Sequence, residues 1–151
     1  MEHLLNSLTG NLRNLIAVGV VDSVNDAGAA QTVNVTTGDG VLRADVEVVL
    51  PFGFTSMPPL DGAICLVFEV GGDPGNLMAL PIGNPSARMG ALQPGEAALY
   101  GGDGSRLHIR QGGVVEIWGG ASVTVNTKEA TINAPNGCTV NGSVTVNGDI
   151  L

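Results

Sequence analysis

The chain has 151 residues, a net charge of −8 and a pI near 4.4, with 44% hydrophobic, 13% charged and 3% aromatic residues and 23 glycines. This acidic balance excludes a nucleic-acid-binding protein, because phosphates need clustered Lys and Arg. The many glycines and few charges exclude a disordered chain and predict β-structure with frequent turns. The sequence has no basic leader and no run of about 18 apolar residues, so we expect neither a signal peptide nor a membrane-spanning helix.

The first segment, residues 1–16, shows helical periodicity. Leucines recur at three-to-four spacing, as at Leu4, Leu8 and Leu12. This spacing predicts a short amphipathic helix over residues 3–16, weakened by an internal glycine. We expect an arm that packs on its own domain rather than a membrane anchor.

The next region, residues 17–83, contains five short segments with strand-like alternation, separated by turns rich in Gly, Asp, Asn and Pro. The expected strands are 17–25, 31–37, 41–50, 63–70 and 77–82. Five short strands in such a span predict a small Greek-key barrel of the OB type, and a two-sheet sandwich is the alternative.

The two cysteines, Cys65 and Cys138, lie in different regions, each on an apolar strand pattern. We therefore expect two buried thiols and no disulfide or metal-ligand spacing. Assembly in a reducing cytoplasm fits this usage.

Residues 84–95 contain two prolines and two glycines and are predicted to be a linker. Residues 96–151 form the last predicted region: 96–100 are expected to be a collar strand, and from Leu107 the chain repeats a unit in which two apolar residues alternate with polar ones and a turn follows. Period-two alternation predicts short strands with one buried face. The expected inner positions, which we call the apolar stripe, are Leu107, Ile109, Val115, Ile117, Val123, Val125, Ile132, Cys138, Val140, Val144, Val146 and Ile150.

One chain is too short to bury the apolar stripe by itself. A single-chain β-helix needs about three strands per coil and at least about three stacked repeats. Three copies wound around a common axis solve this, because each copy supplies one face of a triangular prism and the strand edges pair between copies. We therefore predict an all-β homotrimer with a C-terminal intertwined β-helix. A flat sheet layered on the rest of the domain is the alternative.

No constellation that carries chemistry emerges from the sequence. The histidines, His3 and His108, have no acidic or cysteine companions, so they form neither a zinc site nor a catalytic couple, and His108 is expected to be a solvated rim residue. The glycine-rich stretch Gly71–Gly75 lacks a following Gly-Lys-Ser/Thr and is predicted to be a strand-connecting turn. Trp118 is expected to point outward and pack over the junction. We predict no catalytic residue, cofactor or metal ligand, and hence no enzyme.

Four motifs together carry a resemblance to a known family. They are PFGFTS at residues 51–56, GGD at 71–73, LQPGEAALY at 92–100 and IRQGGVVEI at 109–117. With them the chain, from about Gly19 onward, resembles the central spike (baseplate assembly protein V type) of Mu-like contractile-tailed phages. The resemblance implies a virion protein of the tail baseplate, a trimer whose OB-like barrel contacts the hub and tube proteins. Its spike would pierce the host outer membrane mechanically when the sheath contracts.

The sequence departs from this family at its end. Such spikes often carry a His-x-His pair that holds iron on the three-fold axis, but no histidine follows His108 here. The family's metal site is therefore not carried over to any residue. We expect Ile150 and Leu151 to form an apolar end face that contacts a separate small tip protein, and a simple blunt end is the alternative.

Other functions share part of this pattern. A trimeric adhesin or receptor-binding fibre would be expected to show aromatic or charged clusters along the shaft or a distal knob. An enzyme would use the barrel cleft. A spike of a phage-derived bacteriocin or secretion device would show the same sequence features as a phage spike.

Overall fold

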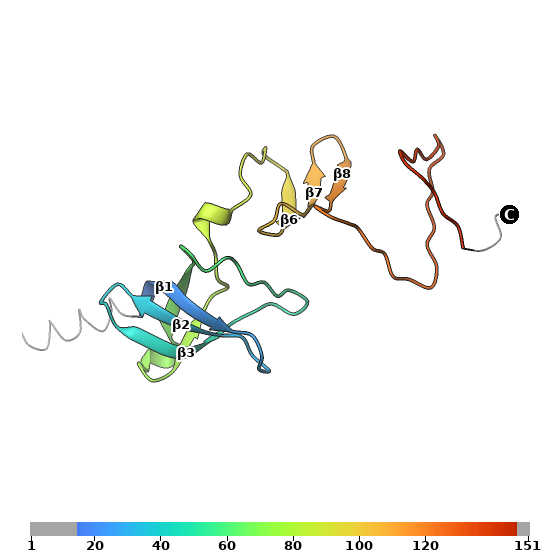
Figure 1. Cartoon of the computed structure of the whole chain (residues 1–151). Coiled ribbons are helices and arrows are strands. Elements are labelled where there is room, and N and C mark those ends of the chain that lie inside the picture. Colours follow the sequence, from blue (N-terminus) through green and yellow to red (C-terminus); the bar gives the residue numbers. More distant parts are fainter. Residues whose placement is uncertain (1–14, 148–151) are drawn as a thin grey trace, which may run out of the picture. The chain divides into compact units, whose positions relative to one another are not determined.

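The computed structural model describes residues 15–147, and these fold into β-strands and two short 3-10 helices (Figure 1). The chain divides into two compact units, one ending at Ala121 and one beginning at Ser122. The strands lie in the first unit. No helix among the described residues is long and apolar enough to span a membrane.

The first five strands close into a barrel. Their bounds are β1 Ile16–Asn25, β2 Thr32–Thr37, β3 Leu42–Val48, β4 Ile64–Glu69 and β5 Leu77–Ala79. The order around the barrel is β1-β2-β3-β5-β4; β3 and β5 pair in parallel and the other pairs are antiparallel. The structure therefore confirms the expected five-stranded barrel and rules out the two-sheet sandwich.

The barrel interior is filled by alternate residues of its strands, as period-two burial requires. Val33 and Val35 of β2 are essentially inaccessible to solvent, and Cys65 and Val67 of β4 are buried beside them. Gly19 of β1 faces Val35 so closely that an added Cβ would overlap the Val35 Cγ2 atom. A glycine at this position therefore lets β2 pack against β1.

Two 3-10 helices lie in the connections, η1 Val70–Gly72 and η2 Pro85–Ala87. Asn84 begins η2: its side-chain oxygen accepts from the amides of Ser86 and Ala87. In the turn after η1 the Asp73 carboxylate accepts from the Gly75 amide at 2.9 Å. This confirms that the glycine-rich stretch is a strand-connecting turn.

A second, three-stranded antiparallel sheet follows, with β6 Ala97–Tyr100, β7 Arg106–Arg110 and β8 Val114–Trp118 in the order β6-β7-β8. The described residues beyond β8, 119–147, form no strand in this single chain. The β-helix predicted there is not confirmed and remains a prediction.

The predicted N-terminal helix falls almost wholly on residues 1–14, which lie outside the described residues. Its expected end at Ile16 is wrong. Ile16 is already the first residue of β1, where it pairs with Phe68 of β4. Strand pairing with β4 therefore takes precedence over helical periodicity at this position.

Candidate assembly surface

One face of the second sheet is entirely apolar. Leu107 and Ile109 of β7 pair across the sheet with Ile117 and Val115 of β8. The exposed fractions of these four residues lie between 37% and 64%. The structure thus brings the first four residues of the predicted apolar stripe onto one solvent-exposed face.

Leu99 of β6 belongs to the same face and was missed by sequence reasoning. It pairs with Leu107 and is 52% exposed. The signal was present, because Ala97 and Leu99 continue the alternation of β7 into the preceding strand. We call the five residues Leu99, Leu107, Ile109, Val115 and Ile117 the apolar sheet face.

The opposite face of the sheet is polar and held by paired side chains. The Arg106 guanidinium lies 4.7 Å from the centre of the Trp118 ring, a cation–π contact. Arg110 Nη1 donates to Glu116 Oε1 at 2.9 Å, and Trp118 Nε1 donates to Glu116 Oε2 at 3.3 Å. Trp118 is 55% exposed on this face, as its alternation predicted. The sheet is therefore amphipathic: its charged side chains lie on one face and its apolar side chains on the other.

His108 is not the solvated rim residue that the sequence predicted. It lies on the polar face but is buried, and its Nε2 atom is 3.2 Å from Glu96 Oε2. Alternation placed the side chain on the correct face, but it could not show that the preceding turn folds over that face. Burial of His108 follows from that turn.

Glu96 is the centre of this turn. Its carboxylate accepts from the Gln93 amide at 3.1 Å and from the Gln111 amide at 3.3 Å, besides its contact with His108. These bonds, the Gln93 amide first, hold the pKa of Glu96 below its usual range. The carboxylate therefore joins the end of the predicted linker to β7.

The remaining described residues of the apolar stripe are exposed in the single chain. From Val123 to Val146 the exposed fractions of its valines and of Ile132 run from 51% to 76%. Cys138 is exposed as well, so its predicted burial is not met within one chain, whereas Cys65 is buried as predicted. Burial raises the pKa of the Cys65 thiol. Ile150 and Leu151 lie outside the described residues.

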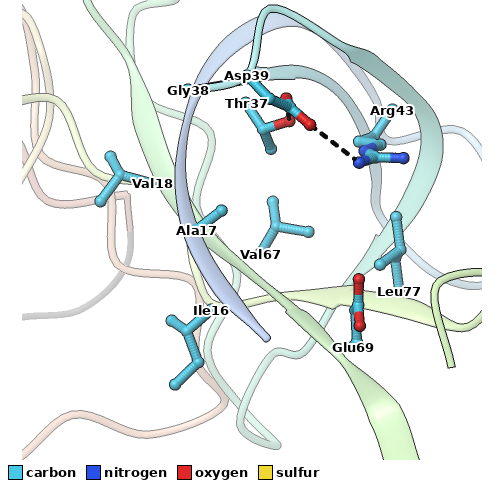
Figure 2. A pocket seen from close by; sticks show the side chains of 10 residues that line it. All are labelled: Ile16, Ala17, Val18, Thr37, Gly38, Asp39, Arg43, Val67, Glu69 and Leu77. Carbon is cyan, nitrogen blue, oxygen red and sulfur yellow. Dashed lines mark hydrogen bonds and ion pairs between the residues drawn. The ribbon is translucent and has the colours of Figure 1, made fainter. Parts of the chain in front are cut away.

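The mouth of the barrel holds a cavity of about 350 Å³ (Figure 2). Its charged residues are Asp39, Arg43 and Glu69. Asp39 accepts from Thr37 Oγ1 at 2.6 Å and from the Val41 amide at 3.1 Å, and it pairs with Arg43 at 3.3 Å. The bond from Thr37 is the main reason that the pKa of Asp39 lies below its usual value.

The carboxylate of Asp39 thus stabilises the turn between β2 and β3 and has no free role in the cavity. Across the part of the chain that the structure describes, no group of three or more His, Cys, Asp or Glu side chains could hold a metal ion.

Fold and surface together define a class: a β-barrel protein that carries an exposed apolar surface suited to assembly. Residues 19–86 match the family model described as "Bacteriophage Mu Gp45, N-terminal". This match confirms the resemblance found in the sequence.

Two relatives extend the similarity beyond the barrel. The chain is 29% identical over 138 residues to "Baseplate puncturing device gp45" of Escherichia phage Mu, covering 87% of this chain and 70% of that protein. It is 30% identical over 113 residues to "Mu-like prophage FluMu protein gp45" of Haemophilus influenzae, covering 75% of this chain. The aligned region covers 61% of that prophage protein, less than two thirds of its length.

Proposed function

We propose that this chain is the central spike of a contractile-tail baseplate and punctures the host outer membrane when the sheath contracts. The observation that carries the proposal is the similarity to the Mu baseplate puncturing device over 87% of the chain. The chain accordingly resides in the virion, in the tail baseplate beside the hub and tube proteins.

The spike is a homotrimer. The apolar sheet face and the exposed residues of the apolar stripe are too apolar to face water along such a length, and three copies around an axis would bury them against one another. In this arrangement residues 96–151 form an intertwined β-helix, the OB-like barrel of residues 17–83 contacts the hub, and residues 84–95 link the two.

The outside of the spike suits passage through a membrane. Between the apolar positions lie neutral polar residues such as Thr124, Asn126 and Thr145. From residue 121 to 151 the charged residues are Lys128, Glu129 and Asp149. Such a surface has little electrostatic attraction for lipid head groups. Backbone bonds between wound chains would keep the spike from unravelling strand by strand under load.

The mechanism is mechanical and uses no active site. The sheath supplies the force and the trimer transmits it to a small area of membrane.

The proposal is tested with assembled particles and host cells that contain a periplasmic β-lactamase. Contraction on the cell should let nitrocefin reach the enzyme, so that hydrolysis rises within minutes of adsorption. Particles assembled with the Val125→Asp chain, whose axis would carry three carboxylates, should give no rise, whereas Thr124→Asp particles should match the wild type. Normal nitrocefin entry with particles that contract but lack this chain would overturn the proposal.

A further inference from the structure

The outer surface of the barrel is apolar on the side formed by β1, β4 and β5. Val18 pairs with Leu66 and Val20 with Ile64 across the two strands, and the side chains at these positions face outward. Figure 2 shows Ile16 and Val18 on the outer side of β1, while Ala17 and Val67 point into the barrel. We call Ile16, Val18, Val20, Ile64, Leu66 and Leu80 the barrel patch, and their exposed fractions run from 36% to 66%.

The side of the same barrel formed by β2 and β3 is more polar, although Leu42 of β3 is 58% exposed there. Asn34 of β2 donates to Ser23 at 3.0 Å, and Thr36 donates to Asp22 at 2.8 Å. Asp45 and Glu47 of β3 are exposed beside them. The barrel patch is therefore a local feature, of the order of 500 Å² and near the upper end of what monomers expose. A patch of this size usually marks a contact surface.

A second apolar feature lies in the connection between β3 and β4. Phe54 N donates to Pro51 O at 3.1 Å, which closes a turn with Gly53 at φ 81°. Glycine adopts this positive φ without strain. Phe52 occupies the tip of the turn and is fully exposed. The turn thus presents the Phe52 ring fully to solvent and leaves Phe54 55% exposed.

The base of this connection is fixed by side chains from elsewhere in the unit. The buried Gln31 donates through Nε2 to Ser56 O at 3.3 Å, and Asn84 donates through Nδ2 to Pro59 O at 2.8 Å. The backbone that carries Phe52 is thus held in place, and exposed aromatic residues often dominate the energetics of interfaces. Phe52 therefore has the properties of a docking anchor.

We propose that Phe52 of one copy docks on the barrel patch of the next copy, so that the three barrels of the spike contact one another in a ring. The inference rests on the proposed trimer and deepens it by naming a second interface. A contact between two different surfaces of the same chain is head-to-tail, and it closes into a ring when the rotation between copies allows it. The three-fold axis of the proposed spike would supply that rotation.

Charge and area favour a second copy of this chain as the occupant. Each copy has a net charge of −8, so copies repel except where uncharged surfaces meet. The barrel patch has no charged member, and residues 51–60 contain no charged side chain. A stable interface needs about 800 Å² from each partner. The barrel patch supplies a large share of this, and the apolar sheet face supplies more along the same trimer.

Cross-linking of the full-length chain tests the contact. In a Cys138→Ser background, Phe52→Cys and Leu66→Cys are combined and treated with a short bismaleimide. We expect covalent trimer on a denaturing gel only when both cysteines are present. Asn34→Cys in place of Leu66→Cys puts the thiol on the polar side of the barrel and should give no covalent trimer.

Each other outcome is decisive. A native mass of three chains without cross-linking overturns the barrel contact and leaves the proposed spike intact, whereas a native monomer overturns the trimer itself. Covalent dimers from Leu66→Cys alone would mean that barrel patches meet each other, which also overturns the proposal. Cross-links that form in assembled particles only to other baseplate proteins would likewise overturn the proposal.

Fluorescence gives a second test that does not depend on a disruptive substitution. In a Trp118→Phe background, Phe52→Trp places the sole tryptophan at the exposed tip of the turn. We expect acrylamide to quench it several-fold less in the trimer than in the urea-unfolded chain. Adding Leu66→Asp should restore strong quenching while the native mass stays at three chains. Strong quenching in the native trimer without Leu66→Asp would contradict the contact.

Discussion

The barrel and the apolar stripe have the same sequence pattern and opposite solvent exposure. In the barrel, alternate residues such as Val33, Val35 and Val67 are buried within one chain. In the stripe, alternate residues such as Val125 and Ile132 are about three-quarters exposed. The difference is closure: the barrel strands return to pair with one another, whereas residues 119–147 find no strand to pair with in the single chain.

This comparison shows that period-two alternation determines which side chains share the apolar face of a strand. It does not determine which part of the same chain, or which other chain, buries that face. A barrel closes on itself and has no free edges. In the proposed trimer, the apolar stripe is instead covered by the other copies. The core of the barrel should therefore fold within one chain, whereas the stripe would be covered only in an oligomer.

The largest expected effect comes from Val125→Asp in the stripe. Three carboxylates would converge away from water, at a cost of several kcal/mol that protonation could only partly relieve. We expect loss of the trimer in light scattering at micromolar concentration. Thr124→Asp, one residue away on the outer face, should be nearly neutral. Equal damage from both substitutions would mean that the inferred register is wrong.

A substitution that creates a cavity in the barrel core should have a smaller and more local effect. Val35→Ala removes a fully buried side chain and should lower the free energy of unfolding of the barrel by about 2 kcal/mol. The trimer mass should not change. Val49→Ala, at a valine that is 42% exposed, is the matched control and should cost little. Dissociation of the Val35→Ala trimer would refute the independence of the two regions.

Cys138 reports on the stripe without any substitution. It is exposed in the single chain but would be buried at the axis of the proposed trimer. A maleimide should therefore label it slowly in the native trimer and quickly after unfolding. Cys65, buried in the barrel, is the internal control and should become reactive only when the barrel unfolds. Rapid labelling of Cys138 in a native trimer would place this residue outside the axis.

The smallest expected effect is on the pH dependence of the stability of the second sheet, through the turn at Glu96. The pKa of Glu96 lies below its ordinary value of 4.5, so its ionised form stabilises the sheet above that value and this stability is lost as the pH falls through the lowered pKa. Unfolding followed by Trp118 fluorescence should therefore be independent of pH above about pH 5 and become easier below it.

Glu96→Gln should weaken the sheet at neutral pH and flatten this acid dependence. Glu47→Gln, at an exposed glutamate of the barrel, is the control and should leave the acid limb unchanged. An unchanged acid limb in Glu96→Gln would show that other carboxylates, such as Glu116 beside Arg110, govern the response.

Most of the barrel could be predicted from the sequence, because short alternating segments between turn residues determine both strands and inner faces. The expected strand at residues 31–37 is β2 Thr32–Thr37, and Cys65 is buried as expected. The second sheet was predicted less completely. Leu99 was missed, and burial of His108 depends on Glu96, a contact across twelve residues that no local pattern reveals.

The apolar stripe marks the limit of sequence reasoning on a single chain. Its alternation identifies which side chains avoid water, but the atoms that cover them would belong to other copies. The same holds for Phe52, which the sequence indicates as part of a turn and whose ring the structure shows fully exposed. In the proposed trimer, the missing information lies between chains in both cases.

The most direct test of the account is the native mass of the full-length chain at micromolar concentration. Each chain has a mass of 15.3 kDa, and we predict a single species of three chains that resists detergent. A folded monomer with the stripe exposed would contradict the account.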